Sequence, residues 1–162
     1  MKRTLFFSTA LLGTAYAASQ APLSLTLTQD LVVRVQKDGK ITEQRQAMPK
    51  SIRPGDLLIE EVTARNTSRG LLRGATVNLP VPRGTVYAGE ATSGGAVRTL
   101  FTVDGKTFGE APLKRKVAVT ENGKAVQKEV TIPPNEYTGV RWVIGAIKPD
   151  ESLKLSFRVT VK

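Results

Sequence analysis

Apolar and polar residues alternate strictly over residues 153–161, near the end of the chain. Leucine, phenylalanine and valine take every second position, and lysine, arginine, serine and threonine take the positions between them. Successive side chains of a β-strand point to opposite faces of the sheet, so this period of two predicts a half-buried strand. A strand containing Trp142 precedes it, and a turn at residues 149–152 connects the two.

Short runs rich in valine, threonine, leucine and isoleucine recur along the chain after residue 17. Glycine, proline, asparagine and aspartate separate them, and no window has the sustained 3.6-residue apolar stripe of a helix. This organisation predicts an all-β sandwich or barrel. The expected strands cover residues 23–28, 31–36, 57–65, 71–79 and 85–88, with residues 41–48 as a polar edge strand or a loop.

Three turns share one local sequence, in which Asp or Asn is followed by Gly and Lys. Such pairs tolerate the positive φ angles of a type I′ turn, so each predicts a β-hairpin. The turns are Asp38-Gly39-Lys40, Asp104-Gly105-Lys106 and Asn122-Gly123-Lys124. In the third hairpin a two-residue turn sets a register that pairs residue 121 with 124, 119 with 126 and 117 with 128.

Residues 1–17 have the features of a secretory signal peptide. Lys2 and Arg3 precede a short apolar stretch, and Ala15 and Ala17 provide the small-x-small spacing of a cleavage site. The stretch is too short to cross about 30 Å of hydrocarbon, and no later run approaches that length. We therefore expect an exported protein, at the cell surface, in the periplasm or secreted, with no transmembrane segment after cleavage.

The chain is strongly basic, with a formal net charge of +10. Loss of Lys2 and Arg3 with the signal peptide would leave 22 Lys and Arg against 14 Asp and Glu, a net charge of +8. A cationic exported protein is attracted to anionic polymers and lipids. The charge is equally compatible with a well-solvated surface that binds nothing.

Composition argues against catalysis and against a metal or other cofactor. The chain has no histidine and no cysteine, which removes the commonest general base, the commonest metal ligand and the thiolate nucleophile. Its acidic residues form no calcium-loop pattern, and its Gly-rich segment lacks the Lys-Ser/Thr of a phosphate-binding loop. We expect a protein that is not an enzyme and binds no cofactor.

Several short motifs together resemble the conserved repeat of bacterial surface proteins, an Ig-like domain of unknown function. The matching residues are Pro54-Gly55-Asp56, Asn66-Thr67-Ser68, Ala75, Val77, Pro80-Val81-Pro82, Gly84, Trp142-Val143-Ile144-Gly145, Ile147, Pro149 and Glu151-Ser152. Leu79 and Asp150 depart from the family pattern, where Asp and Gly are usual. Family members usually carry tandem copies, whereas this chain has room for one.

The resemblance implies an Ig-like β-sandwich with additional β-hairpins. The sandwich would cover residues 50–162 with inserted hairpins around 96–136, and residues 18–49 would form an N-terminal strand appendage. Such domains are spacers, adhesive units or envelope components, so the resemblance implies no catalysis. It predicts a non-catalytic structural or interaction subunit of the bacterial cell envelope.

Three single residues carry structural expectations. Trp142 shares a strand face with Val140 and Ile144, which predicts a core position. The strand pattern places Glu60 on the core face, where an unpaired carboxylate would cost several kcal/mol. Either Glu60 pairs with an Arg, or a bulge or an edge position turns it outward. We favour the outward orientation. Asn66 fits a glycosylation sequon, but we interpret it as a strand-end turn residue.

The hairpin over residues 114–130 is the candidate interaction surface. Five cations lie on it against Glu121 and Glu129, and neither face is cleanly apolar, so we expect a projecting ribbon. The five are Lys114, Arg115, Lys116, Lys124 and Lys128. Its partners would be other cell-envelope proteins or an anionic envelope polymer. Specific nucleic-acid binding is not expected, because aromatic residues are few. The alternative function is a secreted or periplasmic module that binds an acidic polymer through its basic hairpins.

Overall fold

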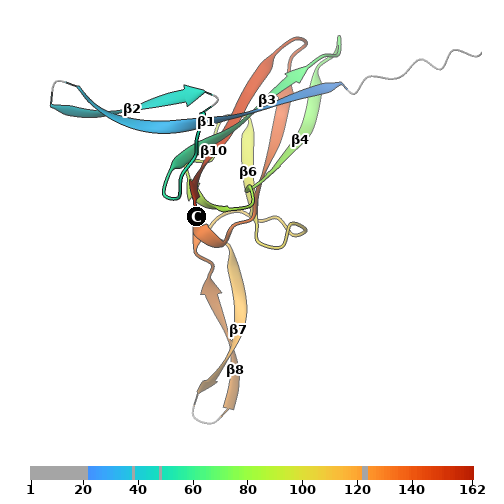
Figure 1. Ribbon diagram of the computed structural model, residues 1–162. Coiled ribbons are helices and arrows are strands. Elements are labelled where there is room, and N and C mark those ends of the chain that lie inside the picture. The colour runs from blue at the N-terminus through green and yellow to red at the C-terminus, as the bar shows by residue number, and fades with distance from the viewer. Residues whose placement is uncertain (1–21, 38, 48, 122–123) are drawn as a thin grey trace, which may run out of the picture.

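The computed structural model describes residues 22–37, 39–47, 49–121 and 124–162. The predicted signal peptide therefore lies outside the described residues. The described chain is all-β, with ten strands in three antiparallel sheets and one 3₁₀ turn, η1 (Pro134–Glu136). Figure 1 shows two sheets packed together and two hairpins that extend beyond them. None of the described segments is a helix of the length and apolarity needed to cross a membrane.

The larger sheet has five strands in the order β2-β1-β3-β10-β5. They are β1 (Leu23–Lys37), β2 (Lys40–Ala47), β3 (Leu57–Asn66), β5 (Thr85–Gly89) and β10 (Ser152–Val161). The runs predicted as two separate strands at 23–28 and 31–36 are one strand. Its first part pairs with β3, and its last part forms the predicted hairpin with β2, which is a polar edge strand.

The smaller sheet has three strands in the order β4-β9-β6. They are β4 (Leu72–Pro80), β6 (Val97–Thr102) and β9 (Gly139–Ile147). Although β6 falls within the predicted insertion at 96–136, it pairs with β9 and contributes buried Phe101 to the core. The remaining pair, β7 (Lys114–Glu121) and β8 (Lys124–Thr131), forms a separate two-stranded ribbon.

The core lies between the two sheets and is built from alternate residues of their facing strands. Trp142 is 0% exposed, as predicted, and its ring stacks on that of Phe157 with centroids 6.1 Å apart. Its indole Nε1 donates a hydrogen bond of 2.9 Å to the Thr92 carbonyl. Because that carbonyl lies in the loop between β5 and β6, the bond fastens this loop to the core.

The favoured interpretation of Glu60 is wrong. The pairing of β3 with β1 and with β10 is continuous past this residue, so no bulge turns it outward. Glu60 is 3% exposed on the core side of the sheet, between Gln29 of β1 and Phe157 of β10. The side-chain amide of Gln29, not an Arg, donates a hydrogen bond of 2.5 Å to its carboxylate.

Asn66 ends β3 as a fully buried turn residue. Its amide nitrogen donates to the carbonyls of Gly70 and Ile147, and its amide oxygen accepts from the backbone N–H and the hydroxyl of Ser68. The side chain thus joins the β3–β4 turn to the end of β9. This explains the sequon-like sequence without glycosylation.

The turn at Asp104 is not part of a hairpin with two strands. A single bridge between Phe101 and Gly109 is the only pairing recorded there among the described residues. The Asp104 carboxylate instead accepts hydrogen bonds from the backbone N–H of Lys106 and Thr107 and from the Thr102 hydroxyl, which hold its pKa well below its usual range. The side chain thus satisfies backbone N–H groups of the loop, which do not need a second strand as a hydrogen-bond partner.

Candidate interaction surface

The β7–β8 ribbon is the feature that projects furthest from the packed sheets at the lower end of the molecule (Figure 1). Its register matches the sequence prediction: Glu121 pairs with Lys124, Val119 with Val126, and residue 117 with 128. The turn residues 122 and 123 lie outside the described residues. All five predicted cations lie on this ribbon and are exposed.

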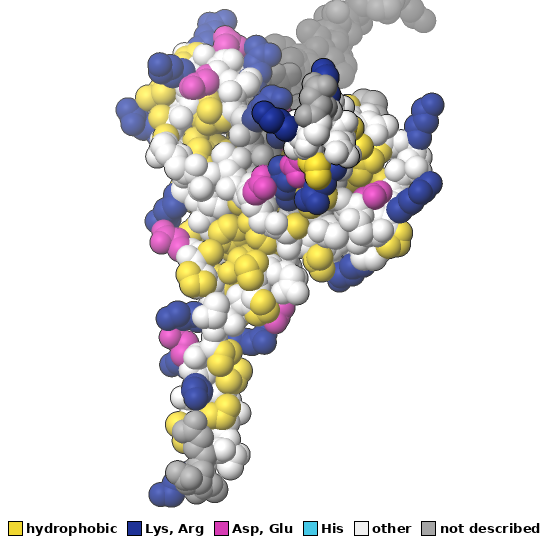
Figure 2. Space-filling view, turned by 90° about the vertical axis from the view of Figure 1, so that its left-hand side faces the viewer, with side chains coloured by type: hydrophobic (Ala, Val, Ile, Leu, Met, Phe, Trp, Pro, Cys, Tyr) yellow, Lys and Arg dark blue, Asp and Glu magenta, His cyan; other side chains and the backbone are white. Residues whose placement is uncertain are grey.

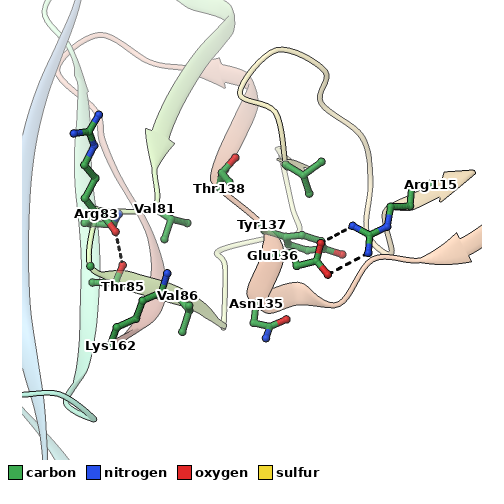
Figure 3. Close-up of a pocket in the computed structure, with 13 residues that line it drawn as sticks. Val81, Arg83, Thr85, Val86, Arg115, Asn135, Glu136, Tyr137, Thr138 and Lys162 are labelled. Atoms are coloured by element: carbon green, nitrogen blue, oxygen red, sulfur yellow. Dashed lines mark hydrogen bonds and ion pairs between the residues drawn. The ribbon is translucent and has the colours of Figure 1, made fainter. Parts of the chain in front are cut away.

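The base of the ribbon is fixed to the body by three contacts. Ile132, which follows β8, is 3% exposed and its backbone N–H donates to the Leu113 carbonyl at 2.8 Å. The Leu113 N–H donates to the Tyr137 hydroxyl at 3.2 Å. Arg115 makes two hydrogen bonds to the Glu136 carboxylate, at 2.6 and 3.4 Å, as Figure 3 shows. The ribbon therefore leaves the body from a defined position.

Arg115 and Lys114, at the base of the ribbon, are held in ion pairs. Arg115 pairs with Glu136 of η1, and Lys114 pairs with Glu129 across the ribbon at 3.0 Å. Both pairs are substantially exposed, and such pairs contribute only about 0–1 kcal/mol. They position the base of the ribbon and remain open to competition from an anionic ligand.

One face of the ribbon combines an apolar stripe with three of the cations. The strand register places Val117, Val119, Val126 and Val130 on this face, together with Arg115, Lys124, Lys128 and one acidic residue, Glu121. Val126 is 44% exposed and the other three valines are half-buried. The opposite face carries polar residues, two alanines and the other cations. Val130 was not predicted as a member of the stripe, although it lies two positions from Lys128 and four from Val126 on the same strand and therefore on the same face.

A groove of about 670 Å³ lies where the ribbon meets the body. Arg83, Arg115 and Lys162 are among its lining residues, together with Glu136 and Tyr137 (Figure 3). Arg83 and Lys162 were not predicted as site residues because they are distant in sequence from the ribbon. The pairing of β5 with β10, which ends in a 2.8 Å hydrogen bond from the Lys162 N–H to the Gly84 carbonyl, brings Arg83 and Lys162 to the same end of the sheet.

Most charges on the outer face of the larger sheet neutralise one another. Glu61 pairs with Arg45 at 3.0 Å and with Lys154 at 2.8 Å, and Arg158 lies between Glu43 and Glu90, each at 2.8 Å. Burial alone would raise the pKa of Glu61, but the hydrogen bonds and charges of Lys154 and Arg45 lower it below its ordinary value. These contacts bind the β1–β2 hairpin to the sheet.

No cluster of three or more potential metal-ligating side chains occurs in the described part of the chain. Burial raises the pKa of Glu60, and Gln29 opposes that rise. This carboxylate lies on the core side of the sheet and does not line the groove at the ribbon base. Its raised pKa is therefore a result of its burial in the core.

Side chains of the ribbon form a narrow surface separated from the broad body, as Figure 2 shows. Hydrophobic, basic and acidic side chains all lie along it. Comparisons with protein-family models, with curated proteins and with solved structures gave no match.

Proposed function

We propose that this protein is a non-catalytic structural or interaction subunit of the bacterial cell envelope, and that it contacts its partner through the β7–β8 ribbon. The observation that carries the proposal is the ribbon's projecting valine face, which is bordered by Arg115, Lys124 and Lys128. Its export and its Ig-like character are part of the proposal. They rest on the sequence of residues 1–17 and on the resemblance described above.

An isolated two-stranded ribbon lacks the support that neighbouring strands give. A two-stranded hairpin is marginally stable in water unless further strands or a packed face support it. Here β7 and β8 pair only with each other among the described strands, and Val126 remains 44% exposed. A partner that covers the valine stripe would supply the missing support.

The mixture of side chains favours a protein partner over a purely electrostatic one. A simple polyanion is bound by charge and needs no apolar stripe, whereas protein interfaces combine a dehydrated apolar centre with a polar rim. On this ribbon the valines form such a centre and the three cations lie beside it. We expect the partner to present an apolar strip flanked by acidic groups.

A second candidate function rests on the groove at the ribbon base. Arg83, Arg115 and Lys162 line it, and they could hold the phosphates or carboxylates of an anionic envelope polymer. In that case the protein would be a secreted or periplasmic module that binds an acidic polymer. Binding would then depend on the cations and would be insensitive to the valines.

A photo-crosslinking amino acid in place of Val126, introduced in the source cells, tests the proposal. The matched control carries it in place of Ile41, which is 72% exposed on the β2 edge strand and lies outside the ribbon. The proposal predicts a discrete crosslink to an envelope protein from position 126 and none from position 41. No crosslink from position 126, or the same products from both positions, would contradict it. Loss of binding to a purified anionic polymer in an Arg83→Gln/Lys162→Gln variant would support the second candidate.

A further inference from the structure

A cavity of about 170 Å³ lies where the loop between β6 and β7 meets the smaller sheet. Gly139 and Arg141 of β9 line it, together with Gly105 and Phe108 of the loop. Because Val140 is a fully buried core residue, Gly139 and Arg141 on either side of it face the outer side of the sheet. None of the residues that line this cavity belongs to the β7–β8 ribbon, so a ligand bound here is independent of the proposed function.

Arg141 is a half-buried cation that no acidic residue neutralises in the described part of the chain. Its guanidinium carbon lies 3.6 Å from the centroid of the Phe108 ring, and its Nε donates a hydrogen bond of 2.7 Å to the side-chain oxygen of Asn78. Every other described Lys or Arg is exposed except Arg158, which lies between two glutamates. A cation that is partly removed from water is normally paired with an anion, and Arg141 lacks the anion that Arg158 has.

The loop that covers the cavity is held in place by its own hydrogen bonds. The Thr102 hydroxyl accepts from the Gly105 N–H at 2.9 Å, and the Asp104 carboxylate accepts from two backbone N–H groups of the loop. At the ends of the loop, Phe101 and Gly109 exchange backbone hydrogen bonds of 2.8 and 3.0 Å. The cavity is therefore formed before a ligand enters it, as is usual for small-molecule sites.

Gly139 keeps the floor of the cavity open. Its φ lies outside the positive range that favours glycine, so the backbone conformation itself does not require this residue. A side chain would instead fill the cavity, because a Cβ would lie 3.3 Å from the methyl carbon of Thr102 and 3.6 Å from the Cα of Pro80. Both residues line the cavity. Glycine thus leaves room for a ligand beside Arg141.

We propose that this cavity binds a small organic acid, whose carboxylate pairs with Arg141 and whose apolar part lies over Gly139. The Phe108 ring covers one face of the guanidinium, which leaves its Nη edge for the coplanar pair of hydrogen bonds that Arg forms with a carboxylate. Leu79 and Pro80 supply apolar lining. The cavity is smaller than the roughly 300–1,000 Å³ of sites for drug-sized ligands, which favours a small acid over a polymer.

Titration with benzoate, followed by two-dimensional ¹H–¹⁵N NMR spectroscopy, tests the site. The backbone signals of Gly105 and Gly139 are expected to shift and to saturate, with a dissociation constant in the millimolar range, because few atoms make contact. Benzyl alcohol, which has the same ring without the carboxylate, is expected to give no saturable shift. Absence of saturable shifts with benzoate, or equal binding of the alcohol, would overturn the proposal.

Three variants separate specific binding from general attraction to a basic protein. Arg141→Gln is expected to weaken benzoate binding about tenfold or more, whereas Arg73→Gln, which removes an exposed charge from β4 of the same sheet, is expected to bind like the parent. Gly139→Ala keeps Arg141 but narrows the cavity, so it should also weaken binding. The indole N–H signal of the single tryptophan, Trp142, reports that each variant is folded. Equal weakening by Arg141→Gln and Arg73→Gln, or a folded Gly139→Ala variant that binds like the parent, would overturn the assignment.

Discussion

Glu60 and Glu61 are adjacent in β3, are both largely buried, and face opposite sides of the larger sheet. Glu60 lies on the core side and is bonded by the neutral amide of Gln29, whereas Glu61 lies on the outer side between Arg45 and Lys154. The pKa of Glu60 is accordingly raised and that of Glu61 is lowered from the ordinary value of 4.5. The two carboxylates should therefore give the stability opposite dependences on pH.

A Glu60→Gln substitution should stabilise the protein at neutral pH. Because its folded-state pKa is raised, Glu60 destabilises the fold progressively as the pH rises from about 4.5 through that folded-state pKa. The neutral amide keeps an acceptor for Gln29 and removes the buried charge. Urea unfolding at about pH 4 and about pH 7 should show a gain in the free energy of unfolding that is larger at the higher pH. A loss of stability at pH 7 would contradict this account of Glu60.

A Glu61→Gln substitution should have the reverse pH profile. The stabilisation from the lowered pKa of Glu61 is present at neutral pH and is lost as the pH falls below 4.5 through the folded-state pKa. Since Arg45 and Lys154 are more than half exposed, the expected cost at pH 7 is only about 1 kcal/mol. The same unfolding experiment measures it, and a cost that persists unchanged in acid would show that the ion pairs are not its source.

Replacing Asn66 should destabilise the fold mainly through the hydrogen bonds that are lost. An Asn66→Ala variant leaves the buried carbonyl of Ile147 without this donor and removes the acceptor that the Ser68 N–H uses. Buried groups without partners cost about 1–3 kcal/mol each. Thermal unfolding should show a loss in that range, and Asn66→Asp, which keeps the acceptor but not the donors, serves as the comparison. An alanine variant that melts like the parent would refute this role.

Truncation of Trp142 should be far more costly than truncation on the ribbon. A Trp142→Ala variant should lose about 3–5 kcal/mol, because the side chain is 0% exposed and packs on Phe157. Val126→Ala is the control, and its 44% exposure predicts a small effect. Chemical denaturation of both variants measures the difference. Equal losses would mean that Trp142 is not central to the core.

Local sequence signals predicted those parts of the structure that depend on local geometry. The Asn122-Gly123 turn set the register of β7 and β8 correctly, since a two-residue loop leaves one way to pair its flanking residues. The half-buried strand at residues 153–161 and the core position of Trp142 were predicted for a similar reason. Each follows from the period of two within one strand.

Features that depend on neighbouring strands were not predictable in this way. The burial of Glu60 depends on Gln29, which is 31 positions away and is brought opposite by the β1–β3 register. The loop at Asp104 resembled a hairpin turn, but its own side chain satisfies the backbone and no second strand follows. Arg83 and Lys162 meet the ribbon base only after the sheets have assembled.

The proposed function requires that the β7–β8 ribbon contact an envelope partner through both its cations and its valines. Two ribbon variants separate these contributions. One replaces Lys114, Arg115, Lys116, Lys124 and Lys128 with Gln, and the other replaces Val117, Val119 and Val126 with Thr, which retains β propensity and charge. The first variant removes the exposed Arg115–Glu136 contact at the ribbon base, but neither alters Ile132 or Tyr137, which also anchor the ribbon to the body.

The most direct measurement is co-sedimentation of the parent and the two variants with the envelope fraction at low and moderate salt. Exposed charges are screened over about 10 Å at 0.1 M salt, so parent binding should weaken as salt is added. The glutamine variant should bind weakly with little response to salt, and the threonine variant should bind weakly but keep the parent's salt response. Recovery of both variants equal to the parent, with the same salt response, would contradict the account and would leave the ribbon's charge as a feature of solubility.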